Sequence, residues 1–219
     1  MSWDREQPGR GRRPFTRPPD DPPGTSRLFI AVPVADDVRG GIGAIMEKLA
    51  GGPVDRRGPG QPRWVRVDGL HLTLRFLGAT PDERQPELAA AITTVAADVR
   101  PFQVVLSGGG AFPNQYRPRV LWIGIGEGAA ELDALERRVD VELRRLGWSA
   151  DDRPFNAHLT LARTDGVSDA DAVARRLVEE ARDVRLTWQA NRLVLYKSNL
   201  GAGPAHYQAL ATSELTASE

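Results

Sequence analysis

Hydrophobic residues follow two spacings along the chain, and these spacings predict helices and strands in turn. In four segments the apolar residues recur three and four positions apart, which is typical of amphipathic helices. Between them lie short runs rich in β-branched and aromatic residues, which predict strands. The expected helices are 36–50, 81–99, 129–146 and 169–181, and the expected strands are 27–34, 64–67, 71–77, 102–106, 119–125, 158–162, 185–196 and 206–215.

The order of these elements predicts an α+β fold made of two similar lobes. Strands 102–106 and 119–125 are separated by a loop with glycine and proline, and strands 185–196 and 206–215 are likewise neighbours along the chain. Such neighbours pair as hairpins, which excludes a purely parallel sheet. The second half repeats the alternation of the first, so we expect antiparallel-rich sheet with helices on the outside in each lobe.

Residues 1–26 differ from the rest of the chain. They hold six of its 17 prolines, together with clustered arginine and aspartate and few aliphatic side chains. Such a segment buries too little apolar surface to offset the entropy lost on ordering it. We therefore expect a disordered tail over 1–26 and a folded domain over 27–219.

Composition removes several classes of function. The 219 residues contain 29 Lys and Arg, 29 Asp and Glu, 3 His and no Cys. Zero net charge argues against adhesion to nucleic acid through a broad basic surface, although it leaves room for a local basic cleft. Without cysteine there is no disulfide, thiolate nucleophile or iron–sulfur cluster. The chain also lacks a long apolar run and a secretory signal, so a cytoplasmic protein without a membrane partner is expected.

Two of the three histidines lie in an identical tetrapeptide, His-Leu-Thr-Leu, which occurs at 71–74 and again at 158–161. Both copies fall in expected strands, where side chains alternate between the two faces. His71 and Thr73 therefore share one face, as do His158 and Thr160, while the leucines point into the core. If the two strands are neighbours, two imidazoles and two hydroxyls line one groove.

This set of groups suits metal-independent cleavage of a phosphodiester. Imidazole ionises near neutral pH, so one histidine can donate a proton while the other accepts one, which predicts a bell-shaped rate profile around neutral pH. Threonine hydroxyls can hydrogen-bond phosphate oxygens. A zinc site is the main alternative use of histidine, but no third convincing ligand accompanies the pair, and His206 lies in a turn beside glycine and proline.

The sequence resembles the 2H phosphoesterase superfamily, and within it the RNA 2′,3′-cyclic phosphodiesterases, also named for 2′-5′ RNA ligase activity. The resemblance rests on both tetrapeptides with their flanks, and it extends from position 27 to about position 215. The matching segments are 27–31, Trp64 with 71–78, 118–122, 155–163, and 197–200 followed by Tyr207. One departure is Ala157, because family members commonly have proline before the second histidine.

The resemblance implies two lobes with the motifs facing each other across a central cleft, and hydrolysis of a terminal 2′,3′-cyclic phosphate on RNA to a 2′-phosphate. It implies that His71 is the general acid, that His158 is the general base, and that Thr73 and Thr160 hold the phosphate. Pseudo-symmetry allows these two roles to swap. No metal or cofactor is expected, the partner is an RNA 3′ end bearing a cyclic phosphate, and a monomer is expected to suffice.

Arg75 and Arg163 follow the two motifs and are further candidates for phosphate contacts. Simple alternation places Arg163 on the face opposite His158 unless the strand ends or bulges. Phe29 and Trp64 are candidates for stacking a base, with core packing as the alternative. Three other functions remain open: reversible 2′-5′ RNA ligation, binding of cyclic-phosphate RNA ends without turnover, and action on another cyclic phosphate.

Overall fold

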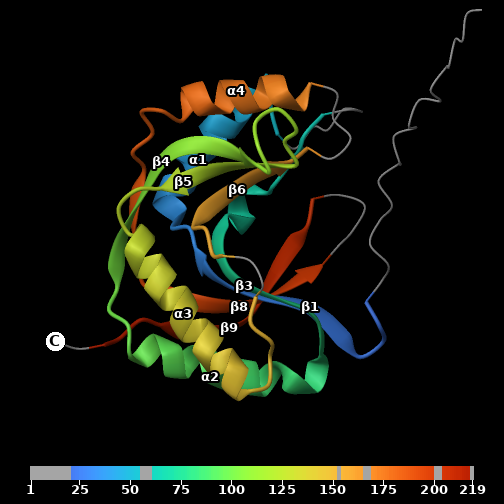
Figure 1. Cartoon of the computed structure of the whole chain (residues 1–219), viewed down its shortest axis with the longest axis vertical. Helices are drawn as coiled ribbons and strands as arrows, with labels where there is room; N and C mark the ends of the chain where they lie inside the picture. The colour runs from blue at the N-terminus through green and yellow to red at the C-terminus, as the bar shows by residue number, and fades with distance from the viewer. Residues whose placement is uncertain (1–20, 55–60, 152–153, 165–168, 200–203, 218–219) are drawn as a thin grey trace, which may run out of the picture.

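The computed structural model of the chain describes residues 21–54, 61–151, 154–164, 169–199 and 204–217 (Figure 1). Its strands join in the order β7-β4-β5-β6-β3-β1-β8-β9, with β2 paired to β6. Neighbouring strands are antiparallel, so the expectation of hairpin neighbours is confirmed for β4 with β5 and for β8 with β9. The strands are β1 (Thr25–Pro33), β2 (Arg63–Trp64), β3 (His71–Pro81), β4 (Phe102–Phe112), β5 (Val120–Ile125), β6 (His158–Arg163), β7 (Thr187–Ala190), β8 (Arg192–Asn199) and β9 (His206–Glu214).

The helices divide this sheet into two lobes. The helices are α1 (Asp36–Ala50), α2 (Gln85–Ala97), α3 (Ala129–Arg145) and α4 (Ala170–Glu180), with short 3-10 turns η1 (Val67–Gly69) and η2 (Asp82–Arg84). Helices α2 and α3 pack on β3, β8 and β9, whereas α4 packs on β4 and contacts α1 (Figure 1). The lobes meet where β3 and β6 pair through Leu72 and Leu159. The α+β fold of two antiparallel lobes with outer helices is confirmed.

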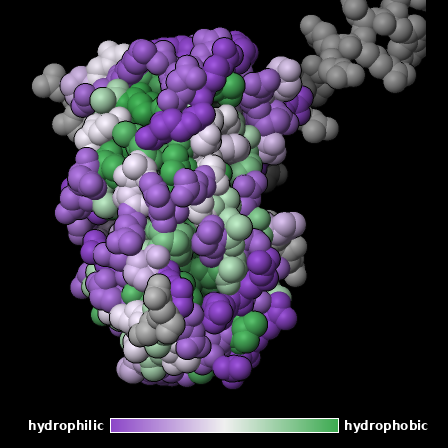
Figure 2. All heavy atoms as spheres, turned by 90° about the vertical axis from the view of Figure 1, so that its left-hand side faces the viewer, coloured by the Kyte–Doolittle hydropathy of each residue, from purple (hydrophilic) through white to green (hydrophobic). Residues whose placement is uncertain are grey.

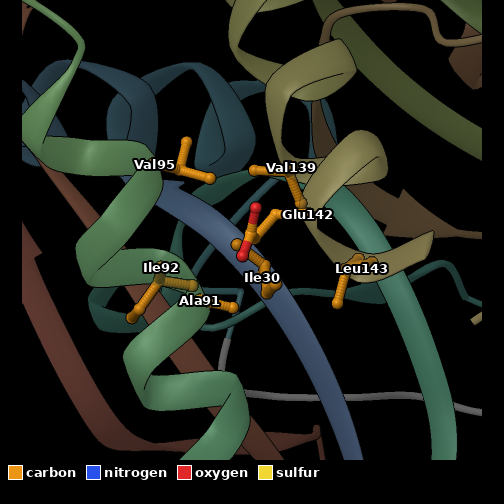
Figure 3. Close-up of a pocket in the computed structure, with 7 residues that line it drawn as sticks. All are labelled: Ile30, Ala91, Ile92, Val95, Val139, Glu142 and Leu143. Atoms are coloured by element: carbon orange, nitrogen blue, oxygen red, sulfur yellow. The ribbon is translucent and has the colours of Figure 1, made fainter. Parts of the chain in front are cut away.

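The apolar spacing in the sequence accounts for how the helices lie on the sheet. Leu132, Leu135, Val139 and Leu143 of α3 are all buried, as the periodicity predicts. Figure 3 shows Val139 and Leu143 directed toward α2, with Ile30 of β1 beneath both helices. The two helices therefore cover one face of β1, and its other face carries Phe29 toward His71.

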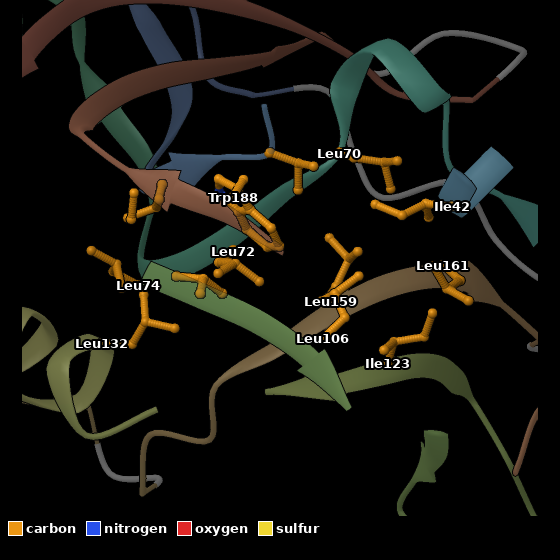
Figure 4. Packing of buried hydrophobic residues seen from close by; sticks show 14 of the residues in the cluster. Ile42, Leu70, Leu72, Leu74, Leu106, Ile123, Leu132, Leu159, Leu161 and Trp188 are labelled. Carbon is orange, nitrogen blue, oxygen red and sulfur yellow. The ribbon is translucent and has the colours of Figure 1, made fainter. Parts of the chain in front are cut away.

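The leucines of the two repeated tetrapeptides form the centre of the core. Leu72, Leu74, Leu159 and Leu161 are each at most 5% exposed. Figure 4 shows them side by side from the two lobes, with Leu106 among them. At about 1.5–3 kcal/mol for each buried leucine, this packing holds both motif strands firmly. The faces that carry the histidines are fixed by the same packing.

Several boundaries differ from those expected. β1 begins at Thr25 rather than at residue 27, and the tail predicted over 1–26 lies mostly outside the described residues. The strand expected over 64–67 is only Arg63–Trp64, because the chain turns into η1. The strand expected over 185–196 is two strands. The first, β7, pairs with β4 at one end of the sheet, and the second, β8, pairs with β1 in the other lobe.

The face shown in Figure 2 is largely hydrophilic, with hydrophobic residues in separate small groups. Among the described residues, none of the helices is long and apolar enough to cross a bilayer.

Candidate active site

The two repeated motifs lie beside each other on β3 and β6 and are related by an approximate two-fold rotation. Since Leu72 pairs with Leu159 in antiparallel register, His71 is level with Thr160, and Thr73 is level with His158. The two histidines are thus diagonal neighbours across the pair, a relation that sets Cβ atoms roughly 7 Å apart. All four of these side chains are half-buried. One phosphate group fits between imidazoles placed in this way.

Both imidazoles are held by the same backbone contact. His71 Nδ1 lies 2.7 Å from the carbonyl oxygen of Gly69, and His158 Nδ1 lies 2.6 Å from that of Asn156. A carbonyl only accepts, so each Nδ1 carries the proton and donates. Each Nε2 is then left to exchange a proton with a substrate, which is the arrangement that acid and base catalysis requires.

A β-bulge follows the threonine in both motifs. On β3, Thr73 pairs with Ala31 and Arg75 with Ile30, so Leu74 is an extra residue. On β6, Thr160 pairs with Trp122 and Ala162 with Leu121, so Leu161 is the extra one. A bulge shifts the alternation of side chains beyond it by one position. The residues that follow it therefore point to the faces opposite to those that simple alternation predicts.

The bulge on β3 turns Arg75 away from the face that carries His71 and Thr73, which corrects the expectation that Arg75 contacts phosphate. Its side chain is 6% exposed and lies under α3. Arg75 Nη1 donates to Asp140 Oδ1 over 2.9 Å, and Nη2 donates to the carbonyl oxygen of Ser149. Arg75 thus joins the first motif strand to α3 and to the segment that leads into the second motif strand.

The bulge on β6 has the opposite consequence for Arg163. Ala162 is fully buried, whereas Arg163 is exposed on the face that carries His158 and Thr160. Arg163 also lies near enough to Tyr207 of β9 for its charge to lower the pKa of that hydroxyl, although burial is the larger influence and raises it. Arg163 therefore faces Tyr207, beside His71.

Aromatic rings surround the first histidine. The ring centroid of His71 lies 4.7 Å from that of Phe29, 5.0 Å from that of Tyr207, which meets it edge-on, and 5.9 Å from that of Tyr196. Tyr207 packs so closely on the turn before His71 that a Cβ at Gly69 would lie 3.0 Å from its Cδ2. These rings exclude water from one side of the imidazole and fix its orientation.

The second histidine has an equivalent but more open setting. Phe112 of β4 meets the ring of His158 edge-on at 4.9 Å between centroids, and Trp122 of β5 lies at 6.4 Å. A Cβ at Gly110 would lie 2.4 Å from Cζ2 of Trp122, so glycine is what lets this indole lie flat on the sheet. Both histidines thus rest on aromatic rings from the neighbouring strands.

Burial shifts the ionisation of both histidines in the same direction. Loss of hydration lowers the pKa of His71 to about 4, and the positive charge of protonated His158 lowers it a little further. Burial also lowers the pKa of His158. The carbonyl contacts act the other way on each pKa but are the weaker influence. At neutral pH both imidazoles are therefore mainly uncharged in the free protein.

Trp64 and Phe29, the two candidates for stacking a base, are both buried by protein side chains. Trp64 is 6% exposed and belongs to the hydrophobic core, so it is a packing residue. Phe29 is 2% exposed and forms the floor beneath His71. In the described ranges, no three His, Asp or Glu side chains come together as a metal site.

Sequence reasoning passed over several aromatic residues that the structure brings to the two histidines. Phe112, Trp122 and Tyr196 reach the histidines from β4, β5 and β8 through strand pairing between distant segments. Phe76 lies on the same face of β3 as His71 because of the bulge, is 59% exposed and lies 6.0 Å from Phe29 between centroids. No local pattern in the sequence signals any of these contacts, since strand register decides them.

Comparison with known families gives one consistent result. A family model described as the 2′-5′ RNA ligase superfamily matches residues 47–202. A Geobacillus stearothermophilus protein named RNA 2′,3′-cyclic phosphodiesterase is 34% identical over 191 residues, which is 87% of this chain but 57% of that protein. A protein of the same name from Archaeoglobus fulgidus is 35% identical over 167 residues, which is 73% of this chain and 89% of that protein.

Solved structures give the same fold. A crystal structure of a Thermus thermophilus protein is 28% identical, with a TM-score of 0.68, and the alignment covers 88% of this chain and all of that one (100%). The structure of E. coli LigT complexed with 3′-AMP is 25% identical, with a TM-score of 0.66, and the alignment covers 88% and 99% of the two chains.

Proposed function

The chain belongs to the 2′-5′ RNA ligase superfamily, and on this premise we propose that it hydrolyses the 2′,3′-cyclic phosphate at RNA 3′ ends to a 2′-phosphate. The observation that carries the proposal is the pair of imidazoles from two repeated motifs, each fixed through Nδ1 by a backbone carbonyl. Nothing beyond these groups and water is needed to balance the reaction. One chain contains both histidines, so we propose that the monomer is active. We also propose that it acts in the cytoplasm.

The proposed step is an in-line attack of water on phosphorus. Nε2 of His158 takes a proton from the attacking water while the new phosphorus–oxygen bond forms. The negative charge of the bound phosphate favours the protonated form of His71. The bond from phosphorus to the 3′ oxygen breaks, and Nε2 of this imidazolium gives that oxygen its proton. One histidine gains a proton and the other loses one, so the protons balance, and the products are a 2′-phosphate monoester and a 3′ hydroxyl. Each such proton transfer contributes typically about 10²–10⁴-fold.

Threonine and arginine complete the proposed phosphate site. The hydroxyls of Thr73 and Thr160 share the histidine face and can donate to the two non-bridging oxygens. Arg163 lies on the same face beyond Thr160 and can neutralise the charge of the phosphate. We propose Arg163 and both threonines as substrate-binding residues, and we do not include Arg75, because its guanidinium is buried against Asp140.

The direct test is turnover of RNA that ends in a 2′,3′-cyclic phosphate, in the presence of EDTA. We expect a 2′-phosphate product and a rate unchanged by the chelator. A 3′-phosphate product would overturn the choice of leaving group, and a rate abolished by EDTA and restored by a metal would overturn the metal-independent mechanism. If RNA with a 5′ hydroxyl is added and joined through a 2′-5′ linkage, the same groups catalyse ligation with that hydroxyl in place of water.

The pH dependence follows from the ionisation of the two histidines. Below the lower pKa both imidazoles are protonated and no base is present, and above the higher pKa both are neutral and no acid is present. Because burial lowers both pKa values, and that of His71 to about 4, the bell-shaped profile of kcat/KM should peak below pH ~6.5, more acid than ordinary imidazoles predict.

Bound phosphate should move this profile. The negative charge of the substrate favours the imidazolium form, so the peak of kcat, which reports the bound enzyme, should lie at higher pH than the peak of kcat/KM. Initial rates between about pH 4 and pH 9 at several substrate concentrations measure both peaks. A kcat/KM that rises steadily through about pH 8 would contradict a mechanism based on two buried imidazoles.

A further inference from the structure

Phe76 is a large apolar side chain that the fold leaves exposed beside the first motif. It is 59% exposed, whereas Leu74 and Arg75 before it are buried and Leu77 after it packs against the core. Phe76 lies between two bulges of β3, since Leu74 is an extra residue before it and Leu77 is one after it. The bulges leave Phe76 on the face of β3 that carries the polar side chains of the motif.

Aromatic contacts connect Phe76 to the first histidine. Phe76 pairs with Phe29 of β1, and the centroids of their rings lie 6.0 Å apart. Phe29 is 2% exposed, and its ring centroid lies 4.7 Å from that of His71. The other rings around His71, those of Tyr196 and Tyr207, are half-buried. Among these rings, that of Phe76 is therefore the most exposed, and the buried ring of Phe29 supports it from one side.

The strand register places Phe76 one ribose away from the proposed phosphate position. Thr73 pairs with Ala31 of β1, and Phe76 pairs with Phe29. The two partners on β1 are two residues apart, so Phe76 lies about 7 Å from Thr73 along the sheet. In a nucleoside 2′,3′-cyclic phosphate a single ribose joins the phosphate to the base, and it spans a distance of this order. A phosphate bound by Thr73 therefore has its own base within reach of Phe76.

The two ends of the paired motif strands differ in chemical character. Arg163 lies beyond Thr160 at one end, and Phe76 lies beyond Thr73 at the opposite end. A guanidinium group suits a charged phosphate, whereas an aromatic ring suits the flat face of a base. A nucleoside cyclic phosphate has the same polarity, with its charge on one side of the ribose and its base on the other. The ligand therefore matches the site in one direction.

We propose that Phe76 stacks on the base of the nucleotide that carries the cyclic phosphate. This inference rests on the proposed function and specifies its substrate: the site binds a nucleoside cyclic phosphate more tightly than the same cyclic phosphate on a ribose without a base. Every base has an aromatic face, so stacking accepts all four bases, and the larger purines gain more from it than the pyrimidines. Phe76 is then a substrate-binding residue outside the two repeated motifs.

The test compares three ligands that share one cyclic phosphate. They are adenosine 2′,3′-cyclic phosphate, cytidine 2′,3′-cyclic phosphate, and the 2′,3′-cyclic phosphate of methyl riboside, which has no base. Dissociation constants are measured with the His158→Ala protein, so that turnover does not consume the ligands. We expect the adenosine ligand to bind about tenfold more tightly than the methyl riboside ligand, with the cytidine ligand between them, because base stacking on an aromatic side chain contributes an effect of this order.

Replacing Phe76 should remove this difference. On the same background, Phe76→Ala is expected to weaken the adenosine ligand about tenfold, the cytidine ligand less, and the methyl riboside ligand by no more than about twofold. Phe76→Tyr should keep the preference, since tyrosine presents an equivalent ring. Tyr116→Ala is the matched control, because Tyr116 is a 74% exposed aromatic residue that lies between β4 and β5 and not on a motif strand. It should preserve the order and spacing of the three dissociation constants.

The outcomes separate this inference from the proposed function. Equal affinity of the His158→Ala protein for the adenosine and methyl riboside ligands would overturn the stacking contact, and the hydrolysis would stand if the protein with both histidines still turned them over. Equal weakening of all three ligands by Phe76→Ala would also overturn the contact, because Phe76 would then act on the phosphate through Phe29 and His71. If the contrast holds but the protein with both histidines turns none of the ligands over, the contact stands and the proposed hydrolysis is wrong.

Discussion

Replacing either His71 or His158 with alanine should lower kcat/KM on cyclic-phosphate RNA by on the order of 10³-fold. Among the residues that the structure describes, each imidazole is the only group placed to carry its proton in the proposed step, and positioned acids and bases contribute about 10²–10⁴-fold. The double variant should lose little more than either single variant, because the two groups act together. Initial rates at about pH 5.5, with excess enzyme for the variants, measure the loss.

The third histidine supplies the control for this prediction. His206 is exposed at the start of β9, pairs with Asn199 of β8 and has no role in the proposed step. His206→Ala should therefore keep activity within about twofold of the parent protein. Thermal unfolding of all variants tests whether lost activity reflects a lost fold. Substantial residual activity in either motif variant, with an intact fold, would show that the reaction does not use two histidines.

Replacing Arg75 with methionine should destabilise the fold and leave substrate binding almost unchanged. Arg75 and Asp140 are 6% and 13% exposed, so solvent does little to screen their ion pair. Removing Arg75 leaves the buried Asp140 carboxylate with only the exposed Arg144 as an ion-pair partner, which costs up to about 3–5 kcal/mol. For a chain of this size that corresponds to a fall in Tm of about 10 °C. Calorimetry measures the fall, and KM well below Tm should stay within about twofold.

Arg144 offers a matched comparison, since it contacts the same carboxylate from the surface. Arg144 Nη2 lies 2.6 Å from Asp140 Oδ2, but the Arg144 side chain is 58% exposed. Exposed ion pairs contribute about 0–1 kcal/mol, so Arg144→Ala should move Tm by at most a few degrees. A large rise in KM for Arg75→Met, without a fall in Tm, would restore Arg75 to the substrate site.

The sequence predicted the parts of this structure that depend on local pattern. Helical spacing located α1 and α3 within one residue at each end, and the repeated tetrapeptide identified His71 and His158 as a pair. The apolar leucines of the repeat were also placed correctly, because strand alternation alone sends them to the core. The sequence left the pairing of β3 with β6 as a condition, and the structure meets it through Leu72 and Leu159.

The remainder depended on register, which no local pattern encodes. Each motif strand has one extra residue, Leu74 in β3 and Leu161 in β6. These two residues decide that Arg75 is buried and that Arg163 lies on the face of His158. Reading the strands as regular gives the reverse for both arginines. Phe112 and Trp122 were missed for a related reason: they reach His158 through strand pairing between segments far apart in the chain. Bulges and very short strands leave almost no trace in composition.

The central claim is that the two histidines act on one phosphate as acid and base, and a change of leaving atom tests it most directly. In a substrate whose 3′ oxygen is replaced by sulfur, the leaving thiolate needs no general acid, because a thiol ionises near pH ~8.5. We predict that His71→Ala regains most of its activity on the sulfur substrate while His158→Ala does not. Loss of activity in both variants on both substrates would contradict this division of roles, and recovery of His158→Ala alone would reverse it.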